Sequence, residues 1–192
     1  GTLPDPRRPA VAIVGARAAS PYGRMQAFRY ARRLSEEGVQ ILSGMAYGID
    51  TEAHRGALEG EGGTWAVLGN GVDICYPSGN RALYQRILRE KCGILSEQPT
   101  GTRARNYFFP ARNRIISGLA DLVVIVEARE KSGSLITAQW ALDQGKSVFG
   151  GIAIGKIQVW KKGEQQVKRY KVEDLDGEVA RFQTAKDEAV EQ

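Results

Sequence analysis

The chain has 192 residues, of which 42% are hydrophobic and 26% are charged, and its formal net charge is +5. This length and balance are typical of a globular protein with one sizeable domain, or one domain with an appendage. No apolar run approaches the roughly 18 residues that a membrane span needs, and no signal pattern opens the chain, so we expect no membrane partner. Cys75 and Cys92 fit neither a metal-ligand spacing nor a disulfide framework, which predicts reduced thiols, a cytoplasmic location and no bound metal.

The positive charge is confined to the first part of the chain. Residues 1–149 contain 19 Lys and Arg against 14 Asp and Glu, whereas residues 150–192 contain eight of each. Sixteen of the 19 basic residues in the first part are arginines. Because arginine favours bidentate phosphate contacts and stacks on rings, this excess indicates a phosphate-bearing or nucleic-acid partner. The same excess is also explained by codon bias in a GC-rich gene.

Short β-branched runs recur at intervals of roughly 25 to 30 residues, the length of one βαβ unit. The expected strands are Val11–Val14, Val39–Ser43, Thr64–Leu68, Gly93–Ser96, Leu122–Glu127 and Ser147–Phe149. Between them, helical spacing of apolar residues predicts helices over Arg24–Glu37, Asp50–Glu59, Arg81–Glu90, Ala111–Leu119 and Ser134–Gln144. This alternation predicts an α/β fold with a doubly wound, mainly parallel sheet.

Parallel sheets of this kind bind ligands beyond the carboxyl ends of their strands. The first glycine-rich loop at that edge runs from Gly15 to Gly23 and contains Arg17. Glycine lets the backbone approach a phosphate, and the start of the next helix attracts an anion. The spacing does not match the dinucleotide fingerprint, so we expect no nicotinamide or flavin cofactor. The alternative is that these glycines only form a tight turn.

The second loop contains Gly44 and Gly48 and ends at Asp50, which we expect to be the N-cap of the next helix. His54 follows one turn later and is the single histidine of the chain. No elbow serine or carboxylate relay accompanies it. We therefore expect His54 to pack or form hydrogen bonds rather than to take part in catalysis.

The segment Phe108–Gly118 combines two aromatic rings with the donors of Arg112, Asn113 and Arg114. Pro110 suits the first turn of a helix. Arginines beside aromatic rings hold single strands by neutralising the backbone and stacking on bases. The alternative is that the two phenylalanines pack in the core while one arginine anchors a loop.

The sequence from Lys131 to Thr137 opens another helix with hydroxyl groups, and it is a second candidate phosphate cradle. The same segment helps to distinguish two possible functions of this fold, binding of a phosphate-bearing ligand and hydrolysis of a nucleoside phosphate. The nucleoside-phosphate phosphoribohydrolases of the lysine-decarboxylase-like group have the signature Pro-Gly-Gly-x-Gly-Thr-x-x-Glu in this region. Here tandem glycines are absent and Thr137 stands where the carboxylate belongs, so this enzyme remains only the alternative function.

Several blocks of the sequence resemble the Rossmann-like domain of the DprA/Smf family over residues 11–149. The blocks, in order, are VAIVGARAASPYG, ILSGMAYGIDTEAHRGAL, AVLGNGVDICYP, ILSEQP, FFPARNRIISGLADLVVIVEA and KSGSLITAQWALDQGKSVF. The resemblance implies a single-stranded DNA-binding recombination mediator, not an enzyme, that protects incoming DNA and hands it to the RecA recombinase in natural transformation. It also implies that Arg17 and the block from Phe109 to Arg114 line the DNA pocket.

Adding the loop residues gives the full expected DNA-binding set, with no catalytic residue and no metal ligand. We expect Arg17, Arg112 and Arg114 each to neutralise a phosphate. The set is Gly15, Arg17, Gly44, Gly48, Phe109, Arg112, Asn113, Arg114, Lys131 and Ser132.

Outside residues 11–149 the chain departs from the family pattern. Residues 1–10 are expected to be a leader or linker. Residues 150–192, which begin with a Gly-Ile-Ala-Ile-Gly-Lys motif, resemble the N-terminal start of Enzyme I of the sugar phosphotransferase system, as in a chimera. A true fusion, a frameshift and an assembly artefact all explain such a junction, and a fragment without activity is a further alternative.

The departure after Phe149 also bears on assembly. The family forms homodimers through the strands that close this domain. We expect these strands to be replaced here, so that the chain is a monomer or weak non-native oligomer that binds DNA poorly and does not load RecA. Ile152, Ile154, Ile157 and Val159 alternate with small or polar residues, which suggests an additional strand in this part of the tail.

Overall fold

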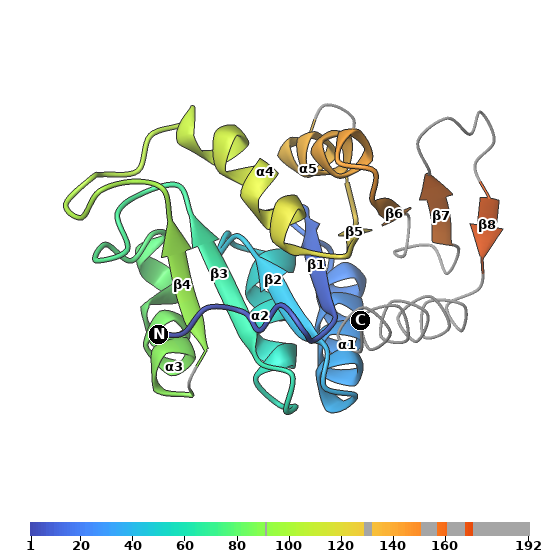
Figure 1. Cartoon of the computed structure of the whole chain (residues 1–192), viewed down its shortest axis with the longest axis horizontal. Coiled ribbons are helices and arrows are strands. Elements are labelled where there is room, and N and C mark those ends of the chain that lie inside the picture. The colour runs from blue at the N-terminus through green and yellow to red at the C-terminus, as the bar shows by residue number, and fades with distance from the viewer. Residues whose placement is uncertain (91, 129–131, 151–156, 161–167, 171–192) are drawn as a thin grey trace.

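The computed structural model describes residues 1–90, 92–128, 132–150, 157–160 and 168–170. Its centre is a sheet in the order β4-β3-β2-β1-β5-β6-β7-β8 (Figure 1). The first six strands are parallel, and β7 and β8 continue the sheet in antiparallel pairing. The strands are β1 (Ala10–Gly15), β2 (Gln40–Ser43), β3 (Thr64–Leu68), β4 (Gly93–Ser96), β5 (Leu122–Val126), β6 (Ser147–Gly150), β7 (Ile157–Trp160) and β8 (Lys168–Tyr170).

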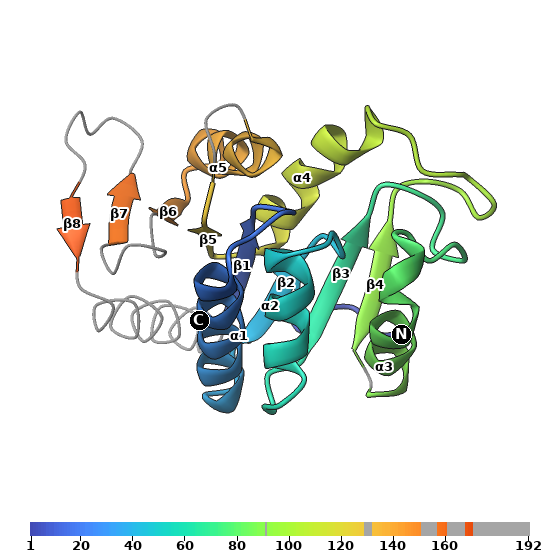
Figure 2. The ribbon, with the colours of Figure 1, turned by 180° about the vertical axis from the view of Figure 1, so that it is seen from behind.

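Helices cover both faces of the parallel part of the sheet. α1, α2 and α3 lie in front of it in Figure 2, and α4 and α5 lie on the other side. A short 3-10 turn, Ser78–Asn80, leads into α3. The helices are α1 (Pro21–Glu36), α2 (Ile49–Ala57), α3 (Arg81–Arg89), α4 (Phe108–Leu119) and α5 (Gly133–Asp143).

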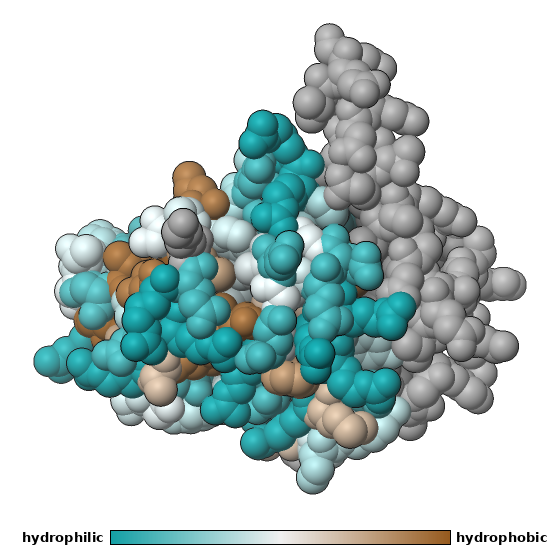
Figure 3. Space-filling model, turned by 90° about the horizontal axis from the view of Figure 1, so that it is seen from below, coloured by the Kyte–Doolittle hydropathy of each residue, from teal (hydrophilic) through white to brown (hydrophobic). Residues whose placement is uncertain are grey.

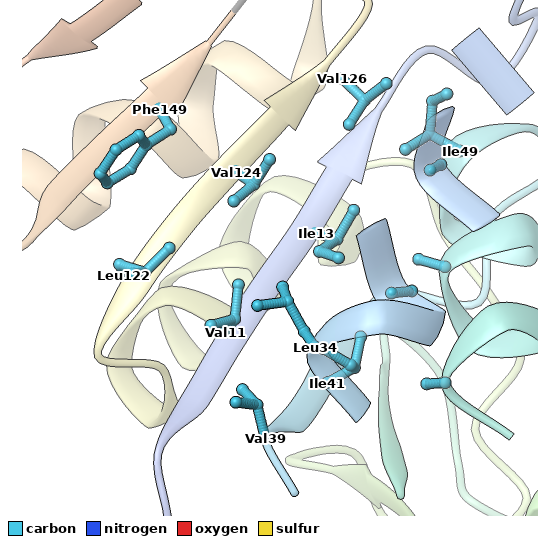
Figure 4. Close-up of a cluster of buried hydrophobic side chains, with 14 residues drawn as sticks. Val11, Ile13, Leu34, Val39, Ile41, Ile49, Leu122, Val124, Val126 and Phe149 are labelled. Atoms are coloured by element: carbon cyan, nitrogen blue, oxygen red, sulfur yellow. The ribbon is translucent and has the colours of Figure 1, made fainter. Parts of the chain in front are cut away.

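Successive residues of each central strand point to opposite faces, so the sheet separates the core into layers. On the α1 and α2 side, Ile13 of β1 and Val124 of β5 pack with Leu34 of α1 (Figure 4). On the other side, Val14 and Val123 pack with Ile116 of α4. Both faces of β1 and β5 are therefore buried, which explains why their sequences are continuously apolar.

The direction of the chain reverses beside β1. From β1 the chain builds β2, β3 and β4 outward on one side, and then returns to place β5 on the other side. The loops that leave β1 and β5 consequently diverge to opposite faces and open a crevice between them. In doubly wound sheets this switch point is the usual ligand site.

The fold class predicted from the sequence is confirmed. All six expected strands and five expected helices are present, and their ends differ from the expected ones by at most three residues. Of the stretch expected to add a strand, Ile157 and Val159 lie in β7, which pairs with β6, whereas Ile152 and Ile154 lie outside the described residues. The rest of the expected Enzyme I-like segment lies largely outside the described residues.

The leader is not a free linker. The backbone amide of Thr2 donates to the carbonyl of Cys92 at 3.1 Å, and the Trp65 indole donates to the carbonyl of Thr2 at 2.9 Å. Further along, the amide of Asp5 donates to Gln40 Oε1 at 2.7 Å. Residues 1–10 are therefore docked on the domain, a long-range packing that a Pro-rich composition does not reveal.

Hydrophilic side chains predominate on the face seen in Figure 3, and apolar residues form smaller patches between them. Among the described residues, no helix combines the length and apolar character needed to cross a bilayer.

Candidate ligand cleft at the carboxyl edge of the sheet

A candidate site lies in a cleft at the switch point between β1 and β5, which we call the main cleft. Its volume is about 430 Å³, within the range of small-molecule and nucleotide sites. It is lined by Val14, Gly15, Ala16, Arg17, Ala46, Asp50, Asn106, Phe109, Pro110, Arg112, Asn113, Ile116, Ser132, Gly133, Ser134 and Thr137.

The β1 loop brings two expected residues to the main cleft. Gly15 permits the close approach of β1 to β5, because a Cβ there would lie 1.8 Å from the carbonyl oxygen of Val126. Arg17 is exposed, and its guanidinium lies 5.2 Å from the centroid of the Phe109 ring. Its charge is thus held at the cleft by a cation–π contact.

The N-terminus of α1 is occupied by a carboxylate of the protein. Glu127, the residue after β5, accepts hydrogen bonds from Ser20 N at 2.9 Å and from Ser20 Oγ at 2.7 Å. The Ser20 hydroxyl in turn caps the helix by accepting from Gly23 N at 3.0 Å. A helix N-terminus attracts an anion, and Glu127 already provides it. The expectation that the first loop offers this helix end to phosphate stays a prediction, and the contacts of Glu127 argue against it.

The N-terminus of α5 faces the main cleft instead. Ser132 is its N-cap residue but makes no side-chain capping hydrogen bond, and its hydroxyl pairs with that of Ser134 at 2.8 Å. The hydroxyls of Ser132, Ser134 and Thr137 all line the cleft, next to Gly133. The unpaired amides of a first helical turn and its positive dipole end favour an anion at this position.

Arg112 is buried in the wall of the main cleft, with only 6% of its surface exposed. Its Nη1 donates to the carbonyl of Gly44 at 2.9 Å and also to the carbonyl of Val67. Its Nε is the one buried side-chain nitrogen or oxygen among the described residues without a hydrogen-bond partner. Burial, together with the nearby charge of Arg17, lowers the pKa of Arg112 to about 10, so it remains a cation at neutral pH.

Asp50 opposes this charge from the start of α2. The sequence predicts Asp50 as the N-cap of α2, and this prediction is wrong. The helix begins at Ile49, and Gly48 is its N-cap residue. The carboxylate of Asp50 instead accepts from the amides of Gly44 at 3.1 Å and Ala46 at 3.3 Å. Burial raises the pKa of Asp50, while the positive charge of Arg112 and these two amides act in the opposite direction. Asp50 thus fixes the β2 loop.

His54 has the expected hydrogen-bonding role. It is fully buried, and its Nε2 accepts from the amide of Met45 at 3.4 Å. Its Nδ1 contacts Thr64 Oγ1 at 2.7 Å, and that hydroxyl donates to the carbonyl of Ile41. These contacts fit a neutral ring with the proton on Nδ1. Burial, aided by the charge of Arg112, lowers the pKa of His54 to about 3.

The remaining expected residues fall into different places. Asn113 lines the main cleft and donates to the carbonyl of Gly133 at 3.1 Å. Gly48, with a φ of 78°, packs on the backbone of Ala16 and Arg17 and does not line the cleft. Arg114 is also outside it and pairs with Glu97. Lys131 lies outside the described residues.

Sequence reasoning missed several residues of this edge. Asn106, Ala46 and Ser134 line the main cleft, but they have no distinctive motif of their own. The exposed rings of Tyr47 and Tyr76 lie beside it and were also missed. An exposed aromatic residue in a glycine-rich loop is a signal that a search for arginine-flanked rings does not detect. Among the described residues, no group of histidine, cysteine and acidic side chains is arranged to hold a metal ion.

Comparisons with known proteins show which family the chain resembles. The sequence profile of a family described as DNA recombination-mediator protein A matches residues 1–170, and so extends beyond Phe149. The chain is 45% identical over 141 residues to Protein Smf of Synechocystis sp., covering 73% of this chain and 35% of that protein. It is 44% identical over 149 residues to DNA processing protein DprA of Streptococcus pneumoniae, covering 78% of this chain and 52% of that protein.

Solved structures of such proteins share the fold. The X-ray structure of DNA processing protein A from S. pneumoniae superposes with a TM-score of 0.70 at 42% identity, over 76% of this chain and 50% of that one. A Helicobacter pylori DNA processing protein A, described for its single-stranded DNA binding mode, gives a TM-score of 0.68 at 35% identity, over 74% and 64% of the two chains. The chain thus spans about a third to two thirds of the length of these relatives.

Proposed function

The chain belongs to the DNA recombination-mediator protein A family, and we propose that it binds single-stranded DNA at the main cleft without altering it chemically. The observation that carries this proposal is the convergence of three anion-attracting groups in one cleft. They are the exposed guanidinium of Arg17, the positive charge of Arg112 in the wall of the cleft, and the N-terminus of α5. A phosphate of the DNA backbone is the ligand that all three favour.

The shape of the site supports single strands over duplex DNA. The cleft is concave, and it contains the half-buried ring of Phe109 beside Arg17. Rings of this kind stack on unpaired bases, whereas duplex recognition uses a helix or ribbon presented to a groove. Stacking tolerates every base, so we expect no sequence preference.

The proposal of binding without catalysis rests on the state of the titratable groups. His54 is buried, neutral and already hydrogen-bonded, and Asp50 is committed to two backbone amides. Neither is placed to exchange a proton with a ligand. Release of free base from a nucleoside monophosphate by the chain would contradict this view and favour the phosphoribohydrolase alternative.

We extend the proposal to the wider role that the family resemblance implies. In it, the chain protects incoming strands in the cytoplasm and hands them to the RecA recombinase during natural transformation. Residues 11–149 form the DNA-binding domain, with a leader over 1–10 and a tail over 150–192. The Enzyme I resemblance of that tail stays a prediction. The expected monomer that does not load RecA is the opposing prediction, and an assay of RecA loading by the chain on single-stranded DNA decides between it and the wider role.

Fluorescence anisotropy with a labelled oligothymidine, measured over a series of salt concentrations, tests the core of this proposal. We expect salt-dependent binding by the chain, and weaker binding with a salt slope reduced by about one for Arg17→Ala. Arg17→Lys keeps the charge, so its slope matches that of the parent.

A blunt duplex of the same sequence is the matched ligand control. Binding of the duplex as tightly as the single strand at equal salt would contradict the proposal. Unchanged salt dependence of the Arg17→Ala variant would remove Arg17 from the site.

A further inference from the structure

Two exposed tyrosines stand beside the main cleft. Tyr47, in the loop after β2, is 49% exposed, and Tyr76, in the loop after β3, is 45% exposed. Both line a second, smaller cleft of about 60 Å³. This second cleft shares Arg17, Phe109 and other residues with the main cleft, so the two are continuous.

An aromatic stack leads from one cleft to the other. Arg17 lies over the ring of Phe109, and the ring of Tyr76 stacks on Phe109 with 5.6 Å between centroids and 21° between planes. Phe109 is half-buried and Tyr76 is 45% exposed, so the stack offers the ring of Tyr76 in addition to the open part of Phe109. The stack therefore extends away from the phosphate-attracting end of α5.

Buried hydrogen bonds tie the two tyrosine loops together. Asn80, four residues after Tyr76, donates to the carbonyl of Met45 at 2.8 Å and to Thr51 Oγ1 at 2.9 Å. The Thr51 hydroxyl donates to the carbonyl of Ala46, directly before Tyr47, at 2.8 Å. The rings are thus held on ordered backbone, which lowers the entropic cost of binding a ligand between them.

The ring of Tyr47 reaches across to the other loop. A Cβ built on Gly79 would lie 2.6 Å from the Tyr47 hydroxyl, so this ring passes over the segment that follows Tyr76. Two half-exposed rings, fixed next to a phosphate site, match the stacking platforms that hold bases of single strands.

We propose that Tyr47 and Tyr76 form a second subsite, which stacks the base of the nucleotide next to the one in the main cleft. The second cleft, of about 60 Å³, is too small to enclose a base, so the base lies across the tyrosines. This inference rests on the proposed function and adds the path of the strand, from the β1–β5 switch point toward β3. It requires an aromatic ring but no charge at either position.

A double variant, Tyr47→Ala with Tyr76→Ala, separates base stacking from phosphate contact. Anisotropy is measured with an oligothymidine and with an abasic strand of the same length. We expect about tenfold weaker binding of oligothymidine, since stacking contributes on this scale per base. The salt slope stays that of the parent, and binding of the abasic strand is unchanged.

Matched variants complete the test. The double Tyr→Phe variant keeps both rings and should bind as the parent does. Tyr22→Ala removes a ring that is 42% exposed but lines neither cleft, and should have no effect. Tyr76→Leu keeps apolar contact with Phe109, which preserves folding while removing the stacking surface.

The possible failures are distinguishable. Oligothymidine binding of the double alanine variant within twofold of the parent, or an equal loss with the abasic strand, would overturn this inference alone, provided that the parent binds and Arg17→Ala weakens binding. If the parent chain binds no oligonucleotide, the proposed function and this subsite fail together.

Discussion

Two helices begin at the same edge of the sheet, and their N-termini differ in what occupies them. The end of α1 is closed by Ser20 and by the carboxylate of Glu127. The end of α5 faces the main cleft with hydroxyl groups, and no described carboxylate contacts it. Both helices follow loops that contain glycine and serine, so the sequence alone predicts a phosphate site at each of the two N-termini.

The difference shows that a helix N-terminus binds an external anion only when the fold has not already supplied one. Glu127 leaves β5 and reaches the start of α1, which neutralises that end and fixes the β1 loop from which Arg17 projects. The α1 end therefore supports the site, whereas the α5 end belongs to it.

The largest effect on DNA binding is expected when the N-terminus of α5 receives a carboxylate of its own. Gly133, the first residue of α5, has open space where a Cβ would be, so Gly133→Glu should fold normally. The new charge repels the DNA phosphate at close range, and we expect about 100-fold weaker binding of oligothymidine. Anisotropy measures the loss.

Gly133→Gln is the isosteric control without charge, and it should bind within a few-fold of the parent. If the glutamate variant binds single strands as well as the glutamine variant, the α5 end is not the phosphate site.

The stability of the fold behind the main cleft depends on pH through His54, which is buried in its neutral form. His54 has a pKa of about 3 in the folded chain against 6.5 for an ordinary histidine. Below pH 6.5 only the unfolded chain takes up this proton, so the free energy of unfolding falls by about 1.4 kcal/mol per pH unit until about pH 3. Above pH 6.5 the contribution is complete and constant.

Denaturant titrations of the parent and of His54→Gln at several pH values isolate this effect from that of the carboxylates. Asp50, whose pKa is raised, acts with the opposite sign in both proteins. Parallel pH profiles for the two proteins would show that His54 does not titrate as described.

A smaller effect is expected at the closed helix end. Glu127→Gln keeps the shape but removes the charge beside Ser20, and should lower the free energy of unfolding by about 1 kcal/mol. Oligothymidine affinity should stay within about twofold, because the α1 end is not offered to DNA. A large gain in affinity would mean that Glu127 had been blocking a second phosphate site.

The smallest effect is expected for Arg114, which sharpens the boundary of the site. It is paired with Glu97 at the surface and lines neither cleft. Exposed ion pairs contribute little, so Arg114→Ala should change stability by about 0.5 kcal/mol or less and leave the salt slope unchanged. If the salt slope of oligothymidine binding fell by one unit in this variant, Arg114 would contact a DNA phosphate, as the sequence predicts.

Most of the fold was predictable because its signals are local. The run Leu122–Val126 is apolar throughout, as a strand covered on both faces requires, and β3 and β4 begin and end at the expected residues. The errors arose where distant residues decide. The leader docks through Thr2 on Trp65 and Cys92, partners that no local pattern connects to it.

The candidate site was predictable to a lesser degree for the same reason. Arg17 and Ser132 line the cleft as expected, since their loops leave strands at the switch point. Buried Arg112 donates hydrogen bonds to the carbonyls of Gly44, in the loop after β2, and of Val67, in β3, and Glu127 closes α1 from 107 residues away in sequence. Such pairings depend on which strands become neighbours, which the spacing of motifs along the chain does not specify.

The central claim is that a DNA phosphate lies at the start of α5 beside Arg17. A titration of the isotope-labelled chain with oligothymidine, followed by the NMR signals of backbone amides and the Arg17 side chain, tests it most directly. The account predicts the largest shifts at Gly133, Ser134 and Arg17, and small shifts at Ser20 and Gly23. Large shifts at Ser20 and Gly23 with none at the start of α5 would contradict it.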